Sequence, residues 1–150
     1  MRNRLFAIAT AMLLVLPLAV SAQMDVKTLW IENGARRIFG KLCKPSNAEG
    51  KQPIVIVSHG FNGTHHFAQD YFKPLTEIGY QVYCFDFPCG SINSQSDNNT
   101  MNMSIEDEVS DVQAIVNYFS KQKDIDRKQI VLIGESQGGL VSALASARMP

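Results

Sequence analysis

Apolar residues dominate three short stretches of the chain, and none of the three shows a strict alternation with polar residues. These stretches are 54–57, 81–87 and 129–133. Such runs are typical of strands buried on both faces of a sheet. Nearer the N-terminus, residues 27–32 and 35–42 flank Asn33-Gly34, a pair that readily adopts the positive φ angles of a tight two-residue turn. The pattern predicts a β-hairpin followed by three buried strands.

Helices are predicted between and after these strands. The predicted helical stretches are 67–78, 105–119 and 138–148. The expected apolar face of the first consists of Phe67, Tyr71, Leu75 and Ile78. Pro74 should kink this helix or make it begin late, and Gly79 should end it. Ser104 can cap the second, with Asp107 three residues later, and the third is rich in small residues.

Strands separated by helices of this length imply parallel pairing with right-handed crossovers. The predicted fold class is therefore α/β, with a doubly wound, mostly parallel sheet that the chain enters through an antiparallel hairpin.

The first residues have the pattern of an export signal. Arg2 and Arg4 precede an almost wholly apolar stretch, 5–20, and Val20-Ser21-Ala22 is the small-residue pattern that signal peptidases cleave. We expect residues 1–22 to be removed, Gln23 to become the N-terminus, and residues 23–150 to form a partial domain of an exported bacterial protein, periplasmic or secreted. A membrane anchor is the alternative, but Pro17 and the cleavage pattern disfavour a stable span.

The composition of the chain argues against nucleic acid and metal ions as binding partners. The 14 Lys and Arg residues balance the 14 Asp and Glu residues, so nothing resembles a basic footprint for nucleic acid. The cysteines Cys43, Cys84 and Cys89 are odd in number, so at least one thiol is unpaired within the chain, and Cys84 is expected in the core. Since there is no C-x-x-C or His/Cys cluster, no metal or other cofactor is expected.

A glycine-rich segment at 134–139 carries the strongest candidate for chemistry. Gly134-Glu135-Ser136-Gln137-Gly138 follows a predicted buried strand and precedes a small-residue helix. A serine on such a sharp turn is held in strained geometry, and its neighbours two residues away must be small. We therefore predict that Ser136 is a nucleophile; the alternative is a serine that merely caps the helix.

A second loop, His59-Gly60-Phe61, follows the 54–57 strand. Acyl transfer needs fixed N–H donors for its oxyanion. The predicted donors are the backbone amides of Phe61 and Gln137, so side-chain changes there should matter little unless they move the loop. His59 is expected to be a structural histidine bonded to backbone. His65 and His66 are interpreted as a polar loop and helix start, with contact to substrate as the alternative.

These motifs together resemble the α/β-hydrolase superfamily. The resemblance rests on Val57-Ser58-His59-Gly60, on the Asp-containing segment 85–91, and on the 134–139 segment. It is closest to the bacterial cinnamoyl- and feruloyl-esterase-like branch. The resemblance implies that Asp86 supports the loop and is not the acid of the triad. Pro88-Cys89-Gly90-Ser91 departs from the more glycine-rich turn of relatives.

A serine triad also needs a base and an acid, which the family carries after the nucleophile. All three histidines precede Ser136. We therefore expect the C-terminal half of the fold to be missing from this sequence, and these 150 residues alone to aggregate and be inactive. The predicted function is serine-dependent hydrolysis of a small-molecule acyl ester. Thioesterase, lipase and serine peptidase activities remain open, as does a truncated or degenerate non-catalytic protein.

Overall fold

The computed structural model describes residues 24–97 and 99–149, so the predicted signal peptide lies outside the described residues. The elements, in chain order, are β1 (Met24–Asn33), β2 (Arg36–Pro45), β3 (Gln52–Ser58), the 3-10 helix η1 (His65–Tyr71), α1 (Phe72–Glu77), β4 (Gln81–Phe85), the 3-10 helix η2 (Thr100–Asn102), α2 (Ile105–Ser120), β5 (Ile125–Gly134) and α3 (Gln137–Ala147). Within these ranges, no helix combines the length and the apolar character needed to cross a membrane.

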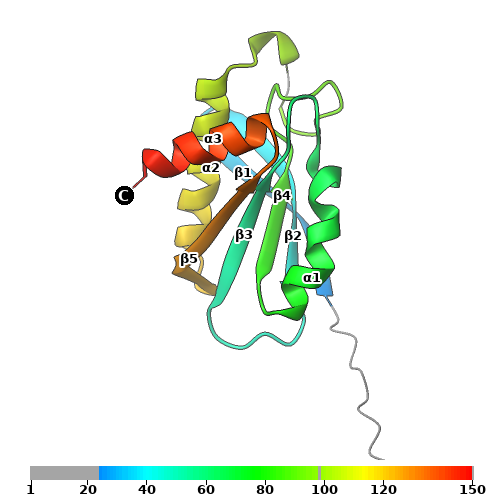
Figure 1. Ribbon diagram of the computed structural model, residues 1–150, viewed down its shortest axis with the longest axis vertical. Helices are drawn as coiled ribbons and strands as arrows, with labels where there is room; N and C mark the ends of the chain where they lie inside the picture. The colour runs from blue at the N-terminus through cyan, green and yellow to red at the C-terminus, as the bar shows by residue number, and fades with distance from the viewer. Residues whose placement is uncertain (1–23, 98, 150) are drawn as a thin grey trace, which may run out of the picture.

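The five strands form one mixed sheet in the order β1-β2-β4-β3-β5, as Figure 1 shows. The hairpin strands β1 and β2 are antiparallel, and β2 pairs antiparallel with β4. β3 pairs parallel with both β4 and β5. The predicted α/β class and the entry of the chain through a hairpin are therefore confirmed. The described sheet is mixed, because the pairs β3–β4 and β3–β5 are parallel and the pairs β1–β2 and β2–β4 are antiparallel.

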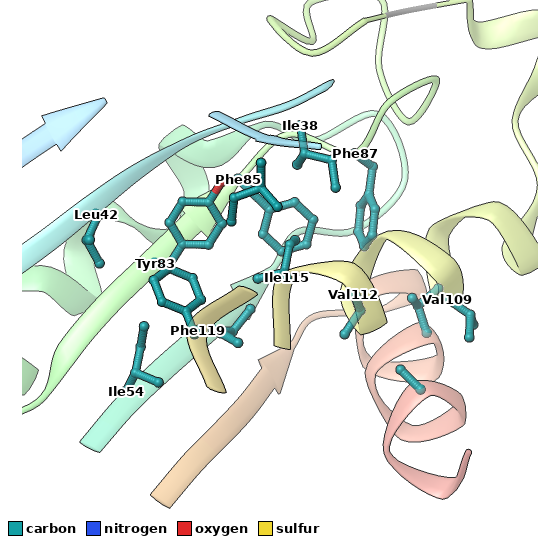
Figure 2. Packing of buried hydrophobic residues seen from close by; sticks show 14 of the residues in the cluster. Ile38, Leu42, Ile54, Tyr83, Phe85, Phe87, Val109, Val112, Ile115 and Phe119 are labelled. Atoms are coloured by element: carbon teal, nitrogen blue, oxygen red, sulfur yellow. The ribbon is translucent and has the colours of Figure 1, made fainter. Parts of the chain in front are cut away.

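Each buried strand contributes to two cores. Ile54 and Ile56 of β3 and Tyr83 and Phe85 of β4 pack in one cluster with residues of α2 and α3 (Figure 2). The alternate positions of the same strands, such as Val55 and Cys84, pack in a second cluster with residues of η1 and α1. Both faces of the sheet are thus covered at β3 and β4, which explains why these two strands show no polar alternation. Cys84, as predicted, is a core residue, and Cys43, Cys84 and Cys89 are all buried free thiols.

The hairpin turn differs by one residue from the prediction. Asn33 pairs with Arg36, so the turn residues are Gly34 and Ala35, and Gly34 takes a φ of 61°. A glycine with positive φ at the first central position is one of the two usual ways to close a two-residue hairpin. Asn33 stays in the strand because its amide donates to Asp111 Oδ1, 2.7 Å away on α2.

The apolar face predicted for the helix over 67–78 was correct in part: Tyr71 and Leu75 pack against the second core cluster, whereas Phe67 and Ile78 are exposed. It begins as the 3-10 helix η1 and becomes α-helical at Phe72, so Pro74 falls in the first turn of α1, where a missing N–H costs little. Three residues per turn in η1 shift the inward positions. Ala68 and Phe72 are buried, whereas Ile78 is 67% exposed. Gly79 ends the helix with a φ of 89°, as expected.

The predicted strand at 129–133 is longer than expected and runs from Ile125 to Gly134. The prediction that it is buried on both faces was wrong, because β5 is the outer strand of the described sheet and Val131 is 40% exposed. The strand predicted over 81–87 stops at Phe85. α2 matches its prediction closely, and its Ser104 cap accepts from the Asp107 amide at 3.1 Å.

Candidate functional site

Ser136 lies between β5 and α3 with a φ of 50° and a ψ of −119°, a backbone conformation that non-glycine residues rarely adopt. The turn is tight on both sides of it. A Cβ on Gly134 would lie 2.3 Å from Gly138 O, and a Cβ on Gly138 would lie 2.4 Å from His59 O. Only glycine fits at these two positions, so the backbone holds Ser136 at the tip of a sharp strand-to-helix turn, with its side chain exposed.

The loop after β3 meets this turn at Gly60. A Cβ on Gly60 would lie 3.3 Å from Ser136 Cβ and 3.9 Å from Ser136 Oγ. The Glu135 amide also donates to Ser58 O at 3.1 Å. The structure therefore brings together the two segments that the sequence analysis singled out, at the carboxyl ends of the neighbouring parallel strands β3 and β5.

Two backbone amides at this junction have no acceptor within the described residues. In the first turn of α3, the amides of Gly138, Gly139 and Leu140 donate to Glu135 O and Ser136 O. The Gln137 amide is not among these donors, as the N-terminus of a helix allows. In the other loop the Asn62 amide donates to Gly90 O at 3.0 Å, whereas the Phe61 amide makes no such bond. The Phe61 side chain is 68% exposed, so it does not anchor the loop by packing.

His59 holds the loops together through both ring nitrogens. Its Nδ1 donates to Gly60 O at 2.7 Å, and its Nε2 accepts from the Phe87 amide at 3.1 Å. The ring is 2% exposed, and burial lowers the pKa of its imidazole. These two bonds fit a neutral ring with the proton on Nδ1. Its part here is to join the loop after β3 to the segment after β4.

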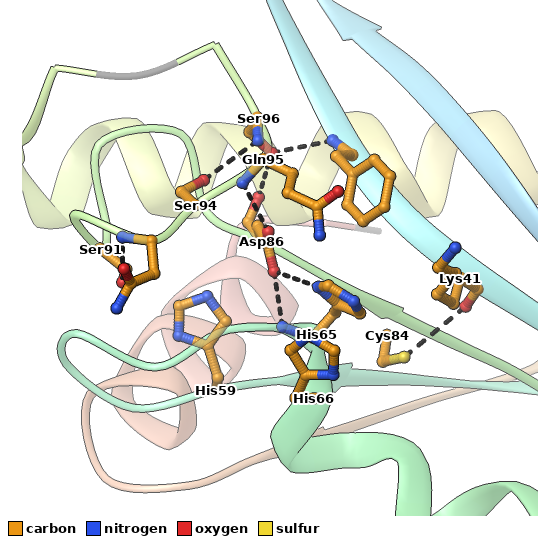
Figure 3. Close-up of polar contacts among 12 residues, drawn as sticks. Lys41, His59, His65, His66, Cys84, Asp86, Ser91, Ser94, Gln95 and Ser96 are labelled. Atoms are coloured by element: carbon orange, nitrogen blue, oxygen red, sulfur yellow. Dashed lines mark hydrogen bonds and ion pairs between the residues drawn. The ribbon is translucent and has the colours of Figure 1, made fainter.

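His65 and Asp86 form a buried pair beside this loop (Figure 3). Asp86 Oδ1 accepts from His65 Nδ1 at 2.8 Å and from the His65 amide at 2.5 Å. Asp86 Oδ2 accepts from the Gln95 amide at 2.7 Å. Asp86 thus ties together the start of η1 and the loop after β4, which is a supporting role. The prediction of a polar loop or helix start at His65 did not include its burial: the residue begins η1 and is 2% exposed.

No hydrogen bond joins Ser136 Oγ to a histidine in residues 24–97 and 99–149. His59 and His65 bond as described above, and His66 Nδ1 lies 3.3 Å from Gln69 Nε2. The described part of the chain thus provides a candidate nucleophile and two backbone amides without an acceptor. Its three histidine rings bond to groups other than Ser136.

Sequence reasoning missed one contact of the site, between Glu108 and Gln137. Gln137 Nε2 donates to Glu108 Oε2 at 2.7 Å and lies 3.7 Å from Met103 Sδ. Glu108 is 1% exposed, and burial raises the pKa of its carboxyl. Glu108 is one of three acidic residues in the first turn of α2, with Glu106 and Asp107. Its spacing from Ile105 and Val112 places it on the apolar face of that helix, which could have indicated burial.

A cavity of about 1520 Å³ lies elsewhere in the described residues. It is lined by residues of β1, α2, β5 and the end of α3, and none of Gly60, Phe61, Ser136 and Gln137 is among them.

Comparison with known proteins agrees with this geometry. Residues 53–150 match the family described as alpha/beta hydrolase fold. An uncharacterized 31.7 kDa protein from the traX-finO intergenic region of Escherichia coli is 31% identical over 90 residues, which is 59% of this chain and 30% of that protein. Est1E from Butyrivibrio proteoclasticus, solved with ferulic acid bound, is 29% identical with a TM-score of 0.69, over 79% of this chain and 47% of that one.

DcsB, solved in complex with its substrate analogue, is 25% identical with a TM-score of 0.71, over 83% of this chain and 42% of that one. With its fold, its strand-to-helix turn and the family match, the chain belongs to the α/β-hydrolase family. It is similar to the feruloyl-esterase-like members of that family. The chain spans about a third of the length of the curated relatives it matches.

Proposed function

We propose that this chain carries the nucleophile and the oxyanion hole of a serine hydrolase that cleaves carboxylic esters through an acyl-enzyme. The observation that carries the proposal is the approach of Gly60 to Ser136, which places the Phe61 loop beside the strained turn at the start of α3. The likeness to Est1E, solved with ferulic acid, supports an ester of a small organic acid as the substrate class.

In the proposed reaction, Ser136 Oγ attacks the ester carbonyl carbon, and the carbonyl oxygen becomes a tetrahedral oxyanion. The amides of Phe61 and Gln137, which have no acceptor in the described residues, donate to that oxygen. The intermediate collapses, the alcohol leaves, and the acyl group stays on Ser136 until water releases it. The hydroxyl proton passes to a base, which in this family is a histidine that follows the nucleophile along the chain, and that base returns the proton to the departing alcohol. The described histidines all precede Ser136 and bond other partners.

The test is steady-state hydrolysis by the full-length protein of p-nitrophenyl acetate and methyl ferulate. Ser136→Ala should lower kcat by about a million-fold, because triad nucleophiles contribute on that order. Ser146→Ala, an exposed serine on the same helix α3, is the matched control and should hydrolyse both esters normally.

Equal rates for Ser136→Ala and the unsubstituted protein would reject Ser136 as the nucleophile. No hydrolysis by any form of the protein would favour the non-catalytic alternative. Including a thioester, a long-chain triglyceride and a peptide in the same assay separates esterase from thioesterase, lipase and peptidase activity.

A further inference from the structure

Glu108 is a buried acid in an unfavourable position for stability. Its side chain is 1% exposed, and Oε2 accepts from the Gln137 side chain. Its other oxygen, Oε1, is buried without a hydrogen-bond partner among the described residues. Leaving a buried polar atom unpaired costs free energy, and an apolar residue would fill an apolar helix face without that cost. Packing of the helix alone therefore does not explain a glutamate at position 108.

The carboxyl group lies between the two segments that carry the proposed oxyanion donors. On one side it bonds Gln137, whose backbone amide is one donor. On the other side it faces Gly90, because a Cβ on Gly90 would lie 3.3 Å from Oε1. The Gly90 carbonyl in turn accepts from the Asn62 amide at 3.0 Å, one residue after Phe61, the other donor.

We infer that Glu108 is a positioning residue of the oxyanion hole, which holds the Gln137 side chain and thereby keeps the Gln137 amide aimed at the developing oxyanion. This inference rests on the proposed function, and it replaces the sequence-based expectation that side-chain changes at Gln137 matter little. The peptide between Ser136 and Gln137 needs such support because Ser136 is held in a rarely populated conformation. Strained residues keep their conformation only when the surrounding structure over-determines them.

The bond requires an acceptor oxygen at position 108 and does not require a negative charge. Burial raises the pKa of Glu108, and a neutral carboxyl still offers its carbonyl oxygen to Gln137 Nε2. An amide offers the same oxygen. Glu108→Gln should therefore keep the contact, whereas Glu108→Met should fill the space and remove it.

The experiment compares these two variants in the full-length protein, with Asp111→Asn as the matched control. Asp111 is a second buried acid on α2, and its hydrogen bonds go to Asn33 and Arg36 instead of the site. For each variant, kcat and KM for p-nitrophenyl acetate and the inhibition constant of phenylboronic acid are measured, together with thermal unfolding. The boronic acid forms a tetrahedral adduct on serine, so its affinity reports on the oxyanion hole.

Glu108→Met should lower kcat by about 10- to 100-fold, since small misplacements of catalytic groups have effects of that size. The inhibition constant of phenylboronic acid should rise in proportion to the loss of kcat. KM should stay within about twofold of the unsubstituted value, because the lost interaction is made with the transition state and not with the bound substrate. Glu108→Gln should stay within about threefold of the unsubstituted kcat, and Asp111→Asn should leave kcat unchanged.

A folded Glu108→Met variant with unchanged kcat and unchanged boronic acid affinity would overturn the inference. If Glu108→Met does not fold, Gln137→Met removes the same bond from the half-buried partner, and an unchanged kcat there overturns it equally. Failure of the proposed function is distinguishable, because it appears as full activity in Ser136→Ala.

Discussion

At the scale of single residues, Gly60 determines how closely the loop after β3 can approach Ser136. A Cβ there would lie 3.3 Å from Ser136 Cβ and 3.4 Å from Glu135 O, and the branches of a larger side chain would reach further. Gly60→Val should therefore push the loop away and lower kcat/KM by about 100-fold or more, as loss of an oxyanion donor does. Phe61→Leu keeps the backbone amide and should change kcat/KM by less than about threefold.

The measurement is kcat/KM on p-nitrophenyl acetate for both variants, with circular dichroism to check that each is folded. The reverse ranking, in which Phe61→Leu is the more damaging change, would contradict this prediction. It would mean that the loop acts through the Phe61 side chain, as part of the substrate pocket, and not through the Phe61 backbone amide.

The residues of the strained turn were predictable from the sequence because their constraint is local. Gly134 and Gly138 flank Ser136 at fixed spacing, and the need for small residues there follows from the turn itself. The contact of Glu108 with Gln137 was not predictable in the same way, since the two partners are 29 positions apart in the sequence. Only the packing of α2 against the start of α3 brings them together.

At the scale of elements, α2 is tied to the hairpin through Asp111. This carboxyl accepts from Asn33 at 2.7 Å and from Arg36 at 3.2 Å, yet burial dominates and raises its pKa to about 7. The neighbouring carboxyl groups of Asp107 and Glu108 on the same helix act in the same direction as burial. Because the folded state holds the proton more tightly than the unfolded state, this contribution to stability is present below pH 4 and is lost as the pH rises through 7.

We therefore expect the unsubstituted protein to lose stability between pH 4 and pH 8 relative to Asp111→Asn, by up to about 4 kcal/mol. The amide has the shape of the neutral acid and does not titrate. Urea unfolding of both proteins across this range measures the difference. Parallel pH profiles for the two would show that Asp111 does not titrate as the structure indicates.

Hydrophobic pattern predicted the existence of the main elements and erred at their edges. The strands β3 and β4 were recognised because continuous apolar runs are typical of strands covered on both sides. The same pattern located β5 but misjudged its burial, because β5 is the outer strand of the described sheet and Val131 is 40% exposed. The start of the first helix was misjudged because the pattern assumed 3.6 residues per turn where η1 has three. The hairpin turn was displaced by one residue because Asn33 bonds to α2, a contact distant in sequence.

At the scale of the whole molecule, the comparisons define the family, while the export of the protein to the periplasm or the medium stays a prediction. Export should remove residues 1–22, so mass spectrometry of periplasmic or secreted material should find a chain that begins at Gln23. Ala22→Arg should block cleavage, because signal peptidase requires a small residue before the cut. Soluble cytoplasmic protein with Met1 intact would contradict this prediction.

The central claim is that Ser136 is an activated nucleophile, and covalent labelling tests it most directly. The full-length protein is treated with a fluorophosphonate, digested with trypsin and analysed by mass spectrometry. Cleavage after Lys128 and Arg148 yields peptide 129–148, which also contains Ser142 and Ser146 as internal comparisons. We predict one adduct on this peptide, located on Ser136 by fragmentation and absent from Ser136→Ala. Labelling at another residue, or no adduct on a folded protein that hydrolyses esters, would contradict the account.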